Sequence, residues 1–163
     1  MLVIADPSPL HSLVLIEHTA MLPTLFGRVL IPPVVAEELQ HPRTPEPVRT
    51  WMASPPAWLE IRPPRPPLLT TALRLGAGER EALSLAHALH ADLLLLADLE
   101  AREEAERRNL AVMGTLRVLE LAAERGLLDF PATMTKLETT SFHIPVQLVQ
   151  DMLARDAARK RPM

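Results

Sequence analysis

The chain has 163 residues, of which 48% are apolar and none is cysteine, and its formal net charge is −3. This length predicts a single domain that buries roughly 70% of its unfolded surface. No apolar run reaches the roughly 18 residues of a membrane-spanning helix, and no basic leader precedes the first strand pattern, so we expect a cytoplasmic protein without a membrane partner. Without thiolates, disulfides are excluded and any metal must take oxygen or histidine ligands. The charge argues weakly against broad electrostatic binding to nucleic acid but leaves local contacts open.

Short apolar runs alternate with helical patterns in the first 39 residues. The run 2–5 ends at Asp6 and predicts a buried strand. Pro7 suits the first turn of the helix that follows, and Ser8 is placed to cap it. The next predicted elements are a helix over 20–26, a strand over 28–31 and a helix over 34–39. This alternation is typical of an α/β protein with a parallel sheet.

A proline-rich segment over 42–67 holds nine of the 17 prolines. Composition alone is typical of a linker. The segment also holds the chain's two tryptophans, Trp51 and Trp58, which a disordered linker seldom carries. We therefore expect an ordered excursion with a short helix near 48–53 and a strand over 58–61.

The second half of the chain repeats the alternation. Gly76 to Gly78 separates one helical stretch from the next, and the remaining expected elements are helix 79–90, strand 93–97, helix 99–108, strand 111–113, helix 115–125, and C-terminal helices over 132–139 and 145–158. These elements predict one domain over 1–158, with C-terminal helices within 132–158 and a frayed tail over 159–163. Its expected architecture is a three-layer α/β/α arrangement around a central parallel sheet.

Two aspartates, Asp6 and Asp98, each follow a buried strand directly. In an open parallel sheet, ligands bind at the carboxyl ends of the strands where the strand order reverses. Each aspartate is also well placed to cap the helix that follows it. A ligand role and a capping role therefore both remain open for each of them.

Two glutamates lie on apolar helix faces. Glu38 shares the face of Val34 and Val35 and is expected to point inward, and Glu81 lies at the edge of the stripe that continues through Leu85. The alternative for each is a packed stem whose carboxylate extends to solvent. If all four acids converge, they need a counter-charge, since close carboxylates repel one another. A hard divalent cation such as Mg²⁺ or Mn²⁺ supplies it, and such a site can activate water for phosphodiester cleavage.

The order and spacing of several segments resemble the PIN-domain family, in its small prokaryotic group related to the toxins of toxin–antitoxin pairs. The resemblance covers nearly the whole chain and is carried by residues 3–10, 26–39, 78–86, 91–98 and 114–119. It implies a parallel sheet between helices and an acidic pocket that holds Mg²⁺ or Mn²⁺ for endonucleolytic cleavage of RNA. It also implies a homodimer and inhibition by a small antitoxin protein.

The resemblance assigns the metal and catalytic roles residue by residue. The first-strand aspartate is Asp6, with Ser8 as its polar companion, and the glutamate before leucine is Glu38. The acid that opens the central helix is Glu81, with Glu79 as the less favoured choice. The acid after the strand of leucines is Asp98.

One position departs from the family pattern. Close relatives tend to carry two consecutive acids after that strand, whereas this chain has Ala97 before Asp98. The alternative function is therefore a catalytically weakened module that binds RNA or a protein partner without cleaving. A receiver-like phosphorylatable domain is disfavoured, because the lysines, Lys136 and Lys160, lie in late helical patterns rather than at a strand end. His11 is more typical of a core edge than of a site residue.

Arginines gather at Arg102, Arg107 and Arg108. Such a cluster is typical of a solvated helix face, and the alternative is a local contact with nucleic acid.

Overall fold

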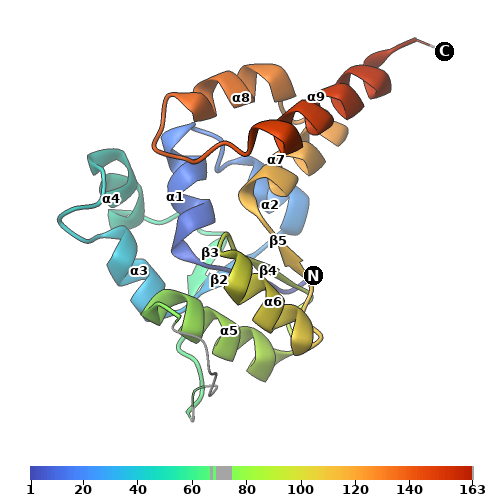
Figure 1. Cartoon of the computed structure of the whole chain (residues 1–163). Helices are drawn as coiled ribbons and strands as arrows, with labels where there is room; N and C mark the ends of the chain where they lie inside the picture. Colours follow the sequence, from blue (N-terminus) through green and yellow to red (C-terminus); the bar gives the residue numbers. More distant parts are fainter. Residues whose placement is uncertain (67, 69–74, 163) are drawn as a thin grey trace.

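Parallel strands form a five-stranded central sheet in the order β3-β2-β1-β4-β5 in the computed structural model, which describes residues 1–66, 68 and 75–162. The strands are β1 (Val3–Ala5), β2 (Val29–Ile31), β3 (Leu59–Ile61), β4 (Leu93–Leu95) and β5 (Val112–Met113). Figure 1 shows the sheet between two groups of helices. The predicted α/β/α architecture is confirmed.

Helices follow the strands as the sequence patterns predict, within one or two residues at most ends. They are α1 (Pro7–Leu15), α2 (Met21–Phe26), α3 (Pro33–Leu39), α4 (Glu46–Ala53), α5 (Ala77–Leu89), α6 (Leu99–Arg107), α7 (Thr115–Glu124), α8 (Phe130–Glu138) and α9 (Val146–Lys160). The helical stretch expected before Gly76 falls largely outside the described residues. Among the described residues, no helix is long and apolar enough to span a membrane.

Alternate strand residues build two separate cores, because neighbouring side chains of a strand point to opposite faces of the sheet. Ile4 and Leu94 pack with the buried faces of α5 and α6. Val3, Ala5 and Leu95 pack with α1, α2 and the helices on the other face. Both sides of the sheet are thus covered, which is why its strands are continuous apolar runs rather than alternating ones.

The described part of the proline-rich segment, residues 42–66, is ordered and contributes β3 to one edge of the sheet. The rings of Trp51 and Trp58 lie with their centroids 6.1 Å apart, so the two tryptophans join α4 to the turn before β3. The helix and the strand predicted within this segment are both present.

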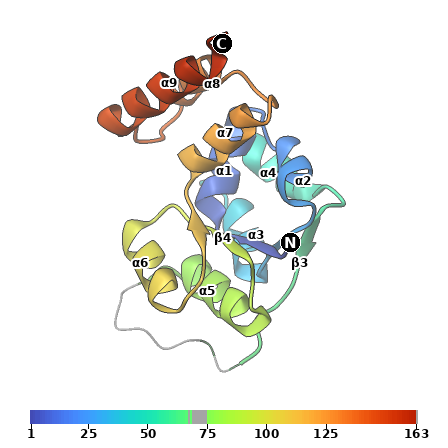
Figure 2. The same ribbon diagram turned by 90° about the vertical axis from the view of Figure 1, so that its right-hand side faces the viewer.

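Helix α9 lies outside α7, as Figure 2 shows, and an ion pair joins the two helices. The carboxylate of Glu120, a residue that is only 4% exposed, accepts hydrogen bonds from Arg155 Nε and Arg117 Nη1, each at 3.0 Å. Val149 and Met152 of α9 add apolar contacts to the same core. These contacts hold α9 against α7.

The chain path puts β1 at the point where the strand order reverses. From β1 the chain moves outward through β2 to β3, then returns to pair β4 with the other side of β1 and continues to β5. In open parallel sheets the crevice at this point, beyond the carboxyl ends of the strands, is where ligands bind. Asp6 is the first residue after β1.

Candidate active site

Asp6 is a buried carboxyl group at the end of the central strand. The residue is 2% exposed, and its backbone N–H donates to the carbonyl oxygen of Leu95 at 3.0 Å, which ties it to β4. It occupies the N-cap position of α1 without making a side-chain capping hydrogen bond, and its Oδ1 is buried without a partner. A buried oxygen without a partner is costly, so this carboxyl is better explained by a ligand than by a capping role.

The pKa of Asp6 is raised to about 8. Burial is the main cause, followed by the negative charges of Glu79, Glu38 and Asp98, while the backbone N–H of Ser8 acts in the opposite direction. Three carboxylates from α3, α5 and the start of α6 are therefore near enough to act on the acid at the end of β1. Like charges gathered in this way are a frequent property of functional sites.

Glu38 lies on α3 and is bound to the start of α5. Its Oε1 accepts a hydrogen bond from the backbone N–H of Gly78 at 3.0 Å. The expectation that Glu38 points into the core is wrong, because the residue is exposed as a whole while Val35 and Leu39 fill the buried face of α3. Its carboxylate reaches across the surface to α5.

Glu79 and Glu81 have different surroundings although they are two residues apart. Glu79 is half-buried in the first turn of α5, where its Oε2 accepts from the N–H of Gly76 at 3.2 Å. Burial raises the pKa of Glu79, and the charges of Asp98 and Glu38 raise it further. The pKa of Glu81 is also raised, by burial and then by Glu37 and Glu38. Of these two glutamates, only Glu79 is among the charges that raise the pKa of Asp6.

Asp98 caps α6. Its Oδ2 accepts the N–H of Ala101 at 2.9 Å, and the residue is exposed. Of the two roles that the sequence left open, Asp98 therefore has the capping role, whereas the side chain of Asp6 does not cap its helix. Its charge nevertheless contributes to the raised pKa values of both Asp6 and Glu79. Ala97, just before it, brings no carboxylate, and its carbonyl oxygen accepts a hydrogen bond from Arg102 Nη2 at 3.0 Å.

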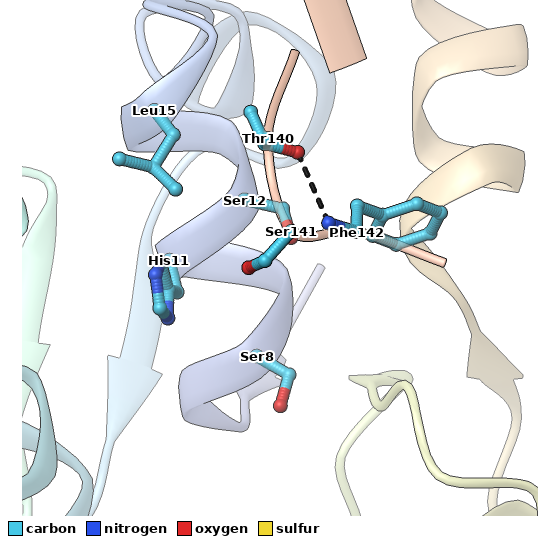
Figure 3. Close-up of a pocket in the computed structure, with 7 residues that line it drawn as sticks. All are labelled: Ser8, His11, Ser12, Leu15, Thr140, Ser141 and Phe142. Atoms are coloured by element: carbon cyan, nitrogen blue, oxygen red, sulfur yellow. Dashed lines mark hydrogen bonds between the residues drawn. The ribbon is translucent and has the colours of Figure 1, made fainter. Parts of the chain in front are cut away.

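Ser8 lies within the first turn of α1 and is not its cap, because Asp6 holds that position. With His11 and Ser12 it forms one wall of a pocket of about 160 Å³, whose other wall is the loop after α8 with Thr140 and Phe142 (Figure 3). Burial lowers the pKa of His11, which keeps this imidazole neutral at pH 7. His11 therefore adds no positive charge beside the carboxylates.

The acidic residues suit a hard cation chemically. Among the described residues, no group of three or more His, Asp or Glu side chains is already arranged to hold a metal ion. The donors are all carboxylate oxygens. The unpartnered Oδ1 of Asp6 is a free ligand for a cation, and the negative charges around Asp6 attract one. The residues therefore fit Mg²⁺ or Mn²⁺ in kind, and coordination requires their side chains to turn toward the ion.

Comparison with known proteins decides the family. A sequence model described as a PIN domain matches residues 2–157. The chain belongs to the PIN-domain family. The match covers nearly all of the chain and confirms the resemblance seen in its motifs.

A solved structure with the same fold is that of a PilT N-terminus domain protein from the hyperthermophilic archaeon Sulfolobus solfataricus P2. The TM-score is 0.53 at 16% identity, and the alignment covers 88% of this chain and 100% of the other. A comparison with curated protein sequences found no match. PIN domains are generally nucleases that bind nucleic acid and use divalent metal ions, so this PIN domain is a nuclease-type module.

Proposed function

We propose that this PIN domain is a metal-dependent endoribonuclease whose centre is Asp6. The observation that carries the proposal is the buried, unpartnered carboxyl of Asp6 at the reversal point of the sheet, with three further carboxylates acting on it. Mg²⁺ or Mn²⁺ bound there lowers the pKa of a water molecule and neutralises charge that develops on the phosphate oxygens.

The residues of the chain divide the work. Asp6 and Glu38 hold the cation, and the N–H of Gly78 keeps the Glu38 carboxylate at the start of α5. The acid from α5 completes the set. We favour Glu79 over Glu81 because Glu79 is the largest of the charges that raise the pKa of Asp6, and Glu81 is not among them. Asp98 either binds the cation or orients the attacking water, and Ser8 supports Asp6 from the first turn of α1.

The first test is calorimetric titration with Mn²⁺ of the wild type and of Asp6→Asn, followed by cleavage of single-stranded RNA in Mn²⁺. We expect the wild type to bind and cleave, and the variant to do neither while keeping the wild-type circular dichroism spectrum. Equal cleavage by the two proteins would overturn the assignment. Glu46→Gln, which removes an exposed first-turn acid of α4 that is not among the charges raising the pKa of Asp6, is the matched control and should behave as wild type.

Ala97 and the absence of a ready-made metal group in the described part of the chain favour a second candidate, a PIN module that binds RNA or a protein without cleaving it. Ala97→Asp separates the two. A large gain in Mn²⁺-dependent cleavage would identify a weakened site, whereas unchanged cleavage would identify Asp98 as the working acid.

We further propose, from the family resemblance, that the protein is the toxin of a toxin–antitoxin pair and forms a homodimer. Light scattering across a concentration range tests the dimer. Growth arrest on expression of the wild type, absent with Asp6→Asn, tests the toxin role.

A further inference from the structure

A pocket of about 520 Å³ opens between the start of α6, the start of α7 and the start of α9. Its lining includes Ala97, which precedes Asp98 of the acidic site, and Met152 of α9. This volume is within the range typical of small-molecule sites and suits one nucleotide. Phe142 lines both this pocket and the smaller one beside Ser8 that Figure 3 shows, so the two pockets share a residue.

The inner end of the pocket is suited to an anion. Thr115, the first residue of α7, is 3% exposed, and its Oγ1 has no hydrogen-bond partner. The N-cap of α7 is Gly114, which has no side chain to accept the N–H groups of the first turn. Helix N-termini with free N–H groups attract phosphates.

Arg102 adds a positive charge at the same point. A Cβ on Gly114 would lie 3.0 Å from Arg102 Nη1, so the absence of a side chain at Gly114 lets the guanidinium approach the start of α7. Arg102 Nη2 is held by the carbonyl of Ala97, its Nε is buried without a partner, and it forms no ion pair with any described residue. A guanidinium that pairs with no described carboxylate, beside an uncapped helix start, provides positive charge and donors that suit an anion.

The outer part of the pocket is apolar. Leu99 is 68% exposed and Leu148 is 43% exposed, and both line the pocket together with Phe142 and Pro145. A nucleobase has the flat apolar faces that such a wall contacts, and aromatic side chains stack on bases without regard to sequence. A phosphate on the donors and a base on the apolar side chains match the two chemistries of the pocket.

We propose that this pocket binds one nucleotide of single-stranded RNA, with its phosphate between Arg102 and the start of α7 and its base against Leu99, Phe142 and Leu148. The inference rests on the proposed function, because it assigns a subsite for the substrate of the acidic site. It favours RNA over an apolar protein segment because the inner end of the pocket offers unpaired donors.

The test is fluorescence anisotropy with a labelled eight-nucleotide single-stranded RNA in EDTA, where no cleavage occurs, at several salt concentrations. Arg102→Met should weaken binding about tenfold and reduce the slope of log K against log [salt] by about 0.7, the value for one lost phosphate contact. Leu99→Ser should weaken binding roughly threefold to tenfold and leave the slope unchanged.

Two controls share the chemistry but lie outside the pocket. Arg107→Met removes an arginine from the same helix that pairs with Glu104, and Val146→Ser removes an apolar residue that is 65% exposed. Both should bind RNA as the wild type does. Thermal unfolding of all four variants checks that they fold.

Several results would overturn the proposal: no RNA binding by the wild type, an affinity that Arg102→Met and Leu99→Ser leave unchanged, or an effect of Leu99→Ser alone. The last two would leave a protein segment as the occupant. Cleavage assays keep this proposal separate from the nuclease proposal. Mn²⁺-dependent cleavage that needs Asp6 but neither pocket residue overturns the pocket alone, whereas pocket-dependent RNA binding without cleavage overturns the nuclease alone.

Discussion

The backbone N–H of Gly78 donates to Glu38 Oε1 at 3.0 Å, and a Cβ at Gly78 would lie 3.0 Å from both oxygens of that carboxylate. The start of α5 thus holds Glu38 close to the acidic site only because residue 78 lacks a side chain. Forty residues separate the two positions in the chain, so this contact also ties α3 to α5.

Gly78→Ala is expected to displace the Glu38 carboxylate and weaken Mn²⁺ binding several-fold. Stability should be unchanged or higher, since alanine is favoured over glycine in a helix by up to about 1 kcal/mol and the displaced group is the end of a flexible side chain. Calorimetry and chemical denaturation measure the two effects. Gly76→Ala is the matched control, because its Cβ would meet nothing closer than 3.9 Å. Equal Mn²⁺ affinities for both variants would contradict the proposed role of Glu38.

The raised pKa of Asp6 predicts that the metal-free protein loses stability as the pH rises. The folded protein keeps the Asp6 proton up to about pH 8, whereas the unfolded chain releases it near 3.8. Between these values the unfolded state binds fewer protons, so the free energy of unfolding falls with pH, by at most about 1.4 kcal/mol per pH unit from this group. Asp6→Asn should flatten the dependence and stabilise the protein most at pH 8. Denaturation in EDTA from pH 4 to 9 measures it, and parallel curves for the two proteins would rule out a buried, protonated Asp6.

Metal binding should release a proton near neutral pH. Because the Asp6 carboxyl is mostly protonated below pH 8 and must ionise to ligate, Mn²⁺ affinity is expected to rise roughly tenfold per pH unit from pH 6 to 8 and then level off. Calorimetry in buffers of different ionisation enthalpy counts the proton, close to one at pH 7 and close to none at pH 9.5. A pH-independent affinity would show that Asp6 is not a ligand.

Glu79→Gln and Glu81→Gln should differ although they change the same helix in the same way. Removing the charge of Glu79 is expected to lower the pKa of Asp6. The free energy of unfolding should then stop falling at a lower pH than in the wild type. Mn²⁺ binding should weaken about tenfold. Glutamine can still accept the N–H of Gly76, so the helix start should survive. Glu81→Gln should leave the Asp6 transition where it is. The reverse result would restore Glu81 as the acid of the site.

The sequence patterns were sufficient for the layers and the strand ends but not for which acids meet there. Buried parallel strands are recognisable because both of their faces are apolar, which placed Asp6 and Asp98 correctly after β1 and β4. The choice between Glu79 and Glu81 depends instead on where α5 begins. The helix starts at Ala77, two residues before the predicted start, and this brings Glu79 into the first turn near the strand ends.

The direction of Glu38 was mispredicted for a related reason. Its expected face was drawn through Val34 and Val35, yet Val34 is only half-buried and lies at the margin of the covered surface. Side-chain spacing gives the angle between residues on a helix, whereas the orientation of the whole helix is set by the elements packed against it. The pocket at Arg102 could not be predicted from the sequence for a similar reason, because its walls come from three helices and a loop within residues 97–152.

The pairing of β1 has a consequence for how the protein is made. This first strand of the chain becomes the middle of the sheet, but one of its two neighbours, β4, follows 90 residues later, where Leu93 aligns with Val3. While the chain emerges from the ribosome, β1 therefore has β2 on one side and an open edge on the other until residue 95 is available. The Asp6 N–H lacks its Leu95 acceptor for the same interval. The proposed catalytic centre thus assembles late, and a growing chain that has not yet produced β4 carries its first acid without the surroundings that would make it act.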